Sequence, residues 1–331
     1  MKNLVMGLVK GYSFEQLRPF VASLRETGYD GDICLFHADT DERTLTALRE
    51  YGVELVPFKY EPLNLLSKRV YPYAIMNRLL KLPRANELFA DLVGLAASTR
   101  GGDRNVKRYR IAARFLNVYC IRFPLYYIHL ARSAGKYANV LISDVRDVIF
   151  QRDPFDFDLG DEVCCFLEDE RDRIRDCRYN TNWLKLGFGP GAVEEVGDNL
   201  VSCSGVTLGS YRAMMHYLEV MNEHLLRLKS HPNGMDQGVH NYVLYKRRLK
   251  DVRLFANGRG PVLTMGKTTD LPTRFDEQGR VLNDDDTVPG VLHQYDRHVE
   301  LGRLALGESG GSVRLRPAAL VEGEPATASV E

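Results

Sequence analysis

The sequence has no net charge and no long apolar run. Its 331 residues contain 44 Lys and Arg and 44 Asp and Glu, so no overall basic field is available to concentrate nucleic acid. No stretch approaches the ~18 uninterrupted apolar residues of a membrane-spanning helix. We therefore expect neither a nucleic acid partner nor a transmembrane segment. Any phosphate binding has to come from a local site.

Cysteine is scarce, and its spacing excludes the common zinc hooks. The six cysteines lie at irregular intervals and form no pair of C-x-x-C motifs. Residues 1–10 contain a short apolar run without the small-residue cleavage site of a signal peptide. We expect reduced thiols and a cytoplasmic protein. Peripheral attachment to a membrane stays open, although no amphipathic anchor stands out.

Several enzyme classes are disfavoured because their motifs are missing. No G-x-G-x-x-G fingerprint follows the first apolar run, which argues against a dinucleotide-dependent dehydrogenase. A phosphatase of the haloacid dehalogenase type needs a second aspartate two positions after the first, and Asp144 has Arg146 there. A sugar-nucleotide pyrophosphorylase needs a glycine-rich phosphate-gripping loop near the N-terminus, which is also absent.

Apolar periodicity alternates between strand-like and helix-like segments in the first 60 residues. Ser13 is a candidate N-cap for a helix with apolar residues at Leu17, Phe20 and Leu24. The other predicted elements are strands at 1–10, 33–36 and 53–57 and a helix at 45–51. Strand–helix–strand alternation predicts an α/β fold with a mainly parallel sheet covered on both faces.

The rest of the chain continues this pattern until its composition changes. We predict helical structure over 106–134 as one helix or two, a charged surface segment over 168–178, strands at 139–143, 201–208, 252–255, 262–264 and 291–292, and helices at 211–228 and 235–245. Beyond residue 302, Gly, Ser, Pro, Ala and Glu prevail without periodicity. The sequence thus predicts one domain over 1–301 and a flexible tail over 302–331.

Two aspartates follow the central-looking strand at 139–143. In open parallel sheets, ligands bind beyond the carboxyl ends of the strands, where Asp144 and Asp147 stand. These carboxylates can converge on Mg²⁺ or Mn²⁺, which would neutralise a diphosphate. Alternatively, Asp147 caps a turn or pairs with Arg146 or Arg152. The chain returns at once to an apolar run, so the charges interrupt a buried element, which favours the metal.

The run 140–150 resembles the metal-binding "DxD" region of GT-A-fold glycosyltransferases, although Val145 occupies the usual position of the first aspartate. Three further segments resemble that family in the expected order over about residues 4–301. They are Cys203-Ser204-Gly205, similar to an "N-S-G" strand with cysteine in place of asparagine; Asp236-Gln237 with Asn241, similar to a "DQ…N" helix start; and residues 293–298, similar to a C-terminal histidine segment. The chain is most similar to retaining, family 8-like enzymes and to relatives with a "DVRDV" signature.

This resemblance implies a Rossmann-like GT-A fold, with a mixed, mainly parallel sheet flanked by helices. It implies transfer of a sugar from a UDP- or GDP-sugar to a glycan, lipid or small-molecule acceptor with Mn²⁺ or Mg²⁺. The residues it implies are Asp144, Asp147 and His293 as metal ligands, Asp144 also as a donor contact, Asp236 and Gln237 as catalytic residues, and Ser204 and Gly205 as lining for the donor sugar. The alternative is a nucleotide-sugar or carbohydrate binder that has lost catalysis, suggested by the displaced aspartate and by Cys203.

The nucleotide is expected over the end of the first strand. Val9, Gly11 and Tyr12 are candidates to bind it: Tyr12 can stack on the base, and Gly11 permits close approach of a ligand. Asp39, after the next strand, is a candidate for the ribose or the base.

Further candidates come from a helix and a loop. Arg122 and Tyr126 lie one helical turn apart and share a face that can meet a phosphate or an acceptor, or pack against the sheet. Lys267 is placed to reach the diphosphate from a loop. Asp236 has an alternative role as a helix N-cap.

Overall fold

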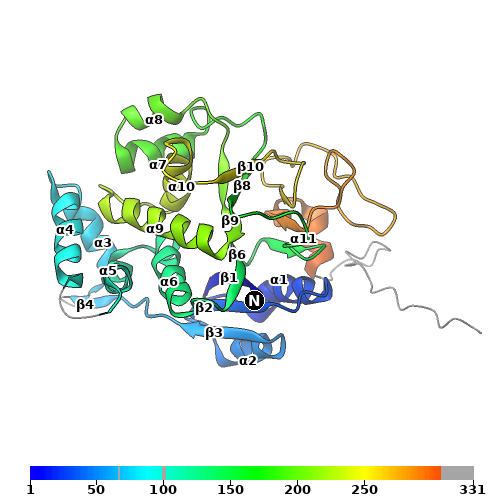
Figure 1. Ribbon diagram of the computed structural model, residues 1–331, viewed down its shortest axis with the longest axis horizontal. Coiled ribbons are helices and arrows are strands. Elements are labelled where there is room, and N and C mark those ends of the chain that lie inside the picture. Colours follow the sequence, from blue (N-terminus) through cyan, green and yellow to red (C-terminus); the bar gives the residue numbers. More distant parts are fainter. Residues whose placement is uncertain (66–67, 99–101, 307–331) are drawn as a thin grey trace, which may run out of the picture.

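The computed structural model describes residues 1–65, 68–98 and 102–306. A seven-stranded sheet forms its centre, with the strand order β10-β8-β9-β6-β1-β2-β3 (Figure 1). Its strands are β1 (Lys2–Lys10), β2 (Asp32–Ala38), β3 (Val53–Pro57), β6 (Tyr137–Ser143), β8 (Val163–Leu167), β9 (Ser202–Ser210) and β10 (Val252–Phe255). A smaller sheet contains β7 (Val148–Phe150), β11 (Val262–Thr264) and β12 (Val291–His293), and β4 (Leu63–Leu65) pairs with β5 (Lys68–Val70).

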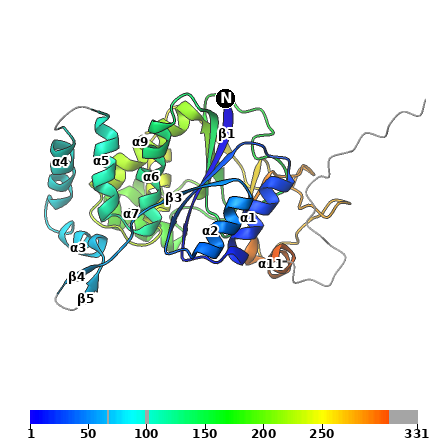
Figure 2. The ribbon, with the colours of Figure 1, turned by 90° about the horizontal axis from the view of Figure 1, so that it is seen from below.

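Helices cover both faces of the main sheet. They are α1 (Phe14–Glu26), α2 (Glu42–Glu50), α3 (Pro72–Leu79), α4 (Ala85–Ala97), α5 (Arg104–Ala112), α6 (Val118–Arg132), α7 (Arg178–Phe188), α8 (Gly191–Val196), α9 (Tyr211–Arg227), α10 (Met235–Tyr245) and α11 (Val299–Leu306), with 3-10 turns η1 (Ala113–Phe115) and η2 (Tyr295–Arg297). Figure 2 shows α1 and α2 on one side of the sheet and α6 and α9 on the other. The predicted α/β class is confirmed.

Strand β9 runs against its neighbours. It pairs antiparallel with β6 and β8, whereas the other pairs of the main sheet are parallel. Ser143 at the end of β6 is therefore opposite Val206, the middle residue of β9. This reversal brings Asp144 beside residues 203–205, which are 59 or more positions away in the sequence.

Alternate side chains of β1 enter two separate cores. Leu4 and Met6 pack in the core that includes residues of α6 and α9. Val5 and Val9 pack in the core that includes residues of α1. Burial on both faces explains why the strands read as continuous apolar runs rather than as alternating patterns.

Local capping signals set several helix ends. Ser13 and Gln16 form a capping box at the start of α1. Asn117 adopts an extended conformation and accepts hydrogen bonds from the backbone amides of Tyr119 and Cys120, so the helical region 106–134 is divided into α5 and α6. Asp236 is not the N-cap of α10, because Gly234 occupies that position with a φ of 79°.

Several segments differ from the sequence-based boundaries, and β8, α7 and α8 lie where no strand or helix was predicted. Residues 302–306, which the composition assigned to the tail, belong to α11, and the remainder of the predicted tail, 307–331, lies outside the described residues. Between β3 and α5 the chain forms β4, β5, α3 and α4, which periodicity did not predict. Among the described helices, none combines the length and the apolar character needed to cross a bilayer.

Candidate active site

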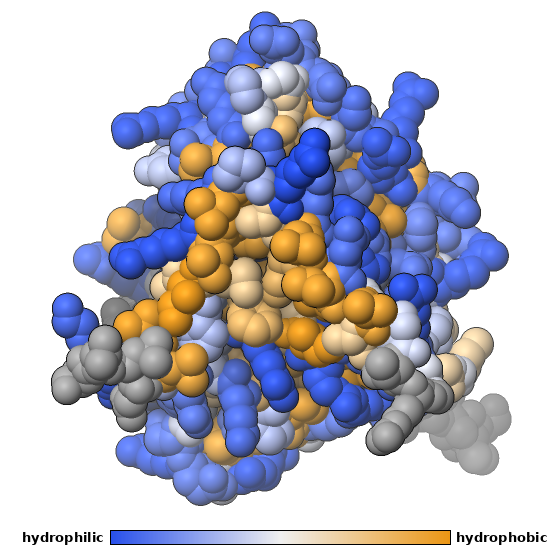
Figure 3. Space-filling model, turned by 90° about the vertical axis from the view of Figure 1, so that its left-hand side faces the viewer, coloured by the Kyte–Doolittle hydropathy of each residue, from blue (hydrophilic) through white to orange (hydrophobic). Residues whose placement is uncertain are grey.

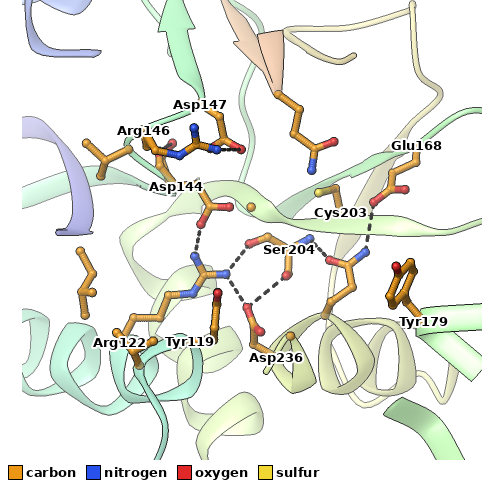
Figure 4. A pocket seen from close by; sticks show the side chains of 18 of the residues that line it. Tyr119, Arg122, Asp144, Arg146, Asp147, Glu168, Tyr179, Cys203, Ser204 and Asp236 are labelled. Carbon is orange, nitrogen blue, oxygen red and sulfur yellow. Dashed lines mark hydrogen bonds and ion pairs between the residues drawn. The ribbon is translucent and has the colours of Figure 1, made fainter. Parts of the chain in front are cut away.

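A pocket of about 590 Å³ lies where β1 and β6 end and β9 begins (Figure 4). This is the edge of the sheet at which open α/β folds bind their ligands. Its lining combines five cationic and four acidic residues: Lys10, Arg122, Arg146, Lys267 and Arg297 with Asp144, Asp147, Glu168 and Asp236. A pocket with both charges suits a ligand that carries a cation and phosphate together.

The structure brings Asp144, Asp147 and His293 together, as the sequence predicted. One ligating atom from each lies within 4.8 Å of the other two. His293 Nε2 is 3.7 Å from Asp144 Oδ2. The backbone fixes this convergence, because Asp144 N donates to Gly205 O at 2.6 Å and Gln294 N donates to Asp147 O at 2.6 Å. The two carboxylates suit Mn²⁺ or Mg²⁺, and the imidazole favours Mn²⁺, the transition metal of the two.

The space between these three residues depends on Gly205. A Cβ atom at that position would lie 2.5 Å from His293 Nε2 and 2.8 Å from Asp144 Oδ2. His293 Nε2 is buried and has no hydrogen-bond partner among the described residues. A buried polar atom without a hydrogen-bond partner is energetically costly, and coordination of a cation by this nitrogen would remove that cost. The residues present therefore fit a divalent metal.

The protonation states of the three residues depend on one another. Burial opposes the charge on Asp144, but Arg122 and His293 outweigh it and lower the pKa of Asp144 to about 2. Burial and the neighbouring Asp144 raise the pKa of Asp147. Burial opposes protonation of His293, yet Cys203 and the two aspartates hold its pKa well above the ordinary value. In this arrangement a proton on His293 supplies part of the positive charge that a metal would supply.

Cys203, which stands where the resembling family has asparagine, contacts the histidine. Its Sγ lies 3.6 Å from His293 Nδ1. This contact leaves Nε2 as the nitrogen near Asp144. The substitution therefore places a weak hydrogen-bonding group behind the histidine, and Cys203 also lines the pocket.

Arg122 connects the metal-ligating residues to Asp236. Its guanidinium pairs with Asp144, donates to Asp236 Oδ2 at 2.7 Å and donates to Ser204 O at 3.2 Å. Tyr126, one turn further along α6, is fully buried and packs against Phe36 of the sheet. The two residues share a helix face as predicted, but only Arg122 reaches the pocket.

Gln237 and Asn241 hold the start of β9 in place. Gln237 Oε1 accepts from Ser204 N at 2.7 Å, and Gln237 Nε2 donates to Ser202 O at 3.0 Å. Asn241 exchanges two hydrogen bonds of 2.9 Å with the backbone of Ser202. Both amide side chains are thus engaged with the strand, and Gln237 also lines the pocket beside Asp236.

The residues predicted to bind the nucleotide at the end of β1 do not all face the pocket. Tyr12 lines the pocket, whereas Val9 is buried in the core on the α1 side of the sheet. Gly11 adopts a φ of 68°, and Asp39 forms an ion pair of 2.6 Å with Lys10. Gly11 and Asp39 therefore stand beside the pocket without lining it, whereas Lys10, which the sequence did not single out, does line it.

Lys267 lines the pocket as expected and forms an ion pair of 3.0 Å with Asp172. Glu168 was missed, because it opens a charged segment that reads as solvated surface. It is half-buried directly after β8 and accepts a hydrogen bond from Gln237 Nε2 at 3.2 Å. Burial raises the pKa of Glu168. Its place directly after the apolar run 163–167, which forms β8 but was not predicted as a strand, is the signal that would have found it.

A second group of potential ligands, Cys34, Glu54 and His129, also lies close together. None of these three lines the pocket. The group at Asp144 therefore remains the candidate metal site of the pocket.

Comparison with protein-family models and with curated proteins finds no match. Solved structures do match. The galactosyltransferase LgtC in complex with donor and acceptor sugar analogs has a TM-score of 0.44 and 14% identity, over 93% of this chain and 96% of that chain. An active-site mutant of LgtC has a TM-score of 0.43 and 14% identity, over 90% and 95%.

Core-mannan synthase A from Aspergillus fumigatus, in its Mn/GDP form, is also similar. Its TM-score is 0.39 with 12% identity, over 77% of this chain and 73% of that chain. The structural neighbours are thus a galactosyltransferase and a mannan synthase. Each likeness has a TM-score below 0.5, so we infer function from the geometry of the site instead.

Proposed function

We propose that this chain is a metal-dependent glycosyltransferase of the GT-A type, which takes a sugar from a nucleoside-diphosphate donor and transfers it to an acceptor. One observation carries the proposal. Asp144, Asp147 and the Nε2 of His293, which has no hydrogen-bond partner within the described part of the chain, converge around the space left by Gly205, beside Asp236. A bound Mn²⁺ or Mg²⁺ would act as Lewis acid toward the diphosphate leaving group.

Different residues of the pocket would bind the base, the diphosphate and the sugar of the donor. Tyr12 lines the end of the pocket near β1 and is suited to stack on the base. Arg297, which is 3.8 Å from Asp147, and Lys267 offer positive charge to the diphosphate. Asp236 and Gln237, at the start of α10, line the same pocket and are suited to contact the transferred sugar.

The surroundings of Asp236 affect both its pKa and its orientation. Burial raises its pKa, while Arg122 opposes that shift and holds the carboxylate in one orientation. Ser204 Oγ lies 3.4 Å from the same Asp236 oxygen. An oriented acid beside a sugar can position its hydroxyl groups or stabilise developing positive charge.

The test is binding followed by turnover. Thermal unfolding of the full chain should be measured with UDP, GDP, CDP and ADP, with and without Mn²⁺. We expect one base to raise Tm by several degrees only when Mn²⁺ is present. Asp147→Asn should lose this shift, whereas Asp156→Asn, an exposed acid outside the pocket, should keep it.

Hydrolysis of the matching nucleotide sugar then distinguishes a transferase from a binder that has lost catalysis, and it does so without knowledge of the acceptor. Release of nucleoside diphosphate that needs Mn²⁺ and Asp147 would support the transferase. Metal-dependent binding without any release would favour the binder that has lost catalysis. Absence of binding by all four nucleotides would overturn the transferase and the nucleotide-sugar binder, and would leave only the carbohydrate binder.

A further inference from the structure

Helix α4, the turn before it and the last residue of α3 expose five leucines to solvent. Figure 3 views this side of the molecule and shows a hydrophobic band framed by hydrophilic residues. The five side chains are 49% to 68% exposed, and we call them the leucine face: Leu79, Leu82, Leu88, Leu92 and Leu95. A contiguous exposed apolar surface of this kind marks a place where a partner binds.

The leucine face is not a by-product of core packing. Leu88, Leu92 and Leu95 are spaced by four and three residues, so they form one stripe along α4. A different stripe, which includes Ala90, Val93 and Ala97, is buried, and α4 packs against α5 and α9. A surface helix with only a core to build would carry polar residues on its outer stripe.

Basic charge is concentrated around this surface. Residues 59–114 contain 12 Lys and Arg and 4 Asp and Glu, whereas the rest of this neutral chain contains 32 and 40. Arg78, Lys81 and Arg84 alternate with the first two leucines of the face and are exposed. Within the described residues, none of the three forms an ion pair. Their charge is therefore available to a partner.

We propose that the leucine face, with Arg78, Lys81 and Arg84, binds the surface of an anionic lipid bilayer. Apolar side chains enter the boundary between headgroups and acyl chains, and cationic side chains remain at the headgroups. The excess of 12 basic over 4 acidic residues in 59–114 complements an anionic bilayer, and a second copy of this neutral chain would offer no such charge overall. The acids of α4, Glu87 and Asp91, lie one turn apart along one edge of the stripe and stay in the aqueous layer.

This surface is connected to the candidate active site. Helix α3 packs on η1, which lies shortly before Val118 and Tyr119 of the pocket wall. Tyr119 is itself exposed. Bilayer binding would thus occur on an element that adjoins the pocket, while the vesicle measurement below needs no nucleotide and does not depend on the proposed chemistry.

The test is cosedimentation of the full chain with vesicles of phosphatidylcholine containing about one third phosphatidylglycerol, against pure phosphatidylcholine. Two triple variants remove the two components: Leu88→Gln/Leu92→Gln/Leu95→Gln and Arg78→Gln/Lys81→Gln/Arg84→Gln. Matched controls replace exposed residues elsewhere: Leu186→Gln/Leu254→Gln/Leu271→Gln and Lys229→Gln/Lys250→Gln/Arg259→Gln. Circular dichroism checks that each variant is folded.

We expect binding to the anionic vesicles that weakens with salt. Each basic residue near the surface contributes about a fivefold factor, so the basic triple should lose on the order of a hundredfold in partitioning. The leucine triple should lose at least about tenfold, and both controls should bind like the wild type. Absent or charge-independent vesicle binding would overturn the proposal. A dimer in sedimentation velocity that the leucine triple dissociates, without vesicle binding, would assign the face to a second copy.

Discussion

Arg122 and Asp236 form a buried ion pair with an N–O distance of 2.7 Å. The same guanidinium also pairs with Asp144, which is partly exposed to the pocket. Burial opposes the charge on Arg122, but Asp144 and Asp236 outweigh it and raise its pKa. One cation on α6 thus orients an acid from the end of β6 and an acid from α10.

Arg122→Met should lower the free energy of unfolding by about 3–5 kcal/mol, because it leaves Asp236 buried without a counter-charge. Urea unfolding at neutral pH measures the change. Arg122→Met/Asp236→Leu removes both charges and should recover a large part of the loss. Equal losses in the single and double variants would show that the pair is not energetically coupled.

The fold was predictable wherever the signal is local. The capping box at Ser13 and the apolar period of α1 lie within one short segment, and so does the strand before Asp144. The strand could not show which of its residues face the pocket. In a strand that is buried on both faces, Val9 and Leu8 are equally good candidates from the sequence, yet of the two only Leu8 lines the pocket.

Contacts between distant segments were not predictable. Arg122 reaches Asp144 across 22 positions and Asp236 across 114. The resemblance in four short segments predicted that Asp144, Asp147 and His293 would meet, but not that Arg122 would occupy the space between Asp144 and Asp236. Helix α4 went unpredicted for another reason, because leucines on its outer stripe remove the amphipathic period.

Gly205→Ala should prevent metal binding while the fold is retained. The added methyl group would lie 2.4 Å from His293 Cε1 and 2.8 Å from Asp144 Oδ2. Displacing the His293 and Asp144 side chains should lower the free energy of unfolding by about 1–3 kcal/mol. Mn²⁺ titration followed by electron paramagnetic resonance measures the loss. Gly191→Ala, with nothing within 4 Å of the added atom, is the matched control and should bind Mn²⁺ normally.

His293→Gln and Asp147→Asn should each weaken Mn²⁺ binding more than the 10- to 100-fold typical of changes behind the ligands. Each substitution removes one of the three converging ligand atoms. The same resonance titration applies, with Asp156→Asn as the control acid. A variant at His293 with wild-type Mn²⁺ affinity would exclude the histidine from the metal site and leave the two aspartates alone.

His240 should make the protein less stable as the solution becomes acidic. It is fully buried between Ser202 Oγ and Tyr217 Oη, each 2.9 Å from a ring nitrogen. Burial and Arg122 lower the pKa of His240 to about 3. Its pKa in the unfolded chain is about 6.5, so between these values the unfolded state binds the proton more readily.

The stability that neutral His240 provides is therefore complete above about pH 6.5 and is lost as pH falls toward about 3. At pH 5 this loss amounts to about 2 kcal/mol. Urea unfolding of wild type and His240→Gln at pH 7 and pH 5 isolates it, because the constant cost of the substitution cancels in the difference between the two pH values. His129, His224 and His231, whose pKa values burial also lowers, remain in both proteins. The variant should thus lose about 2 kcal/mol less than the wild type between pH 7 and pH 5. Equal losses would mean that His240 takes up its proton without unfolding.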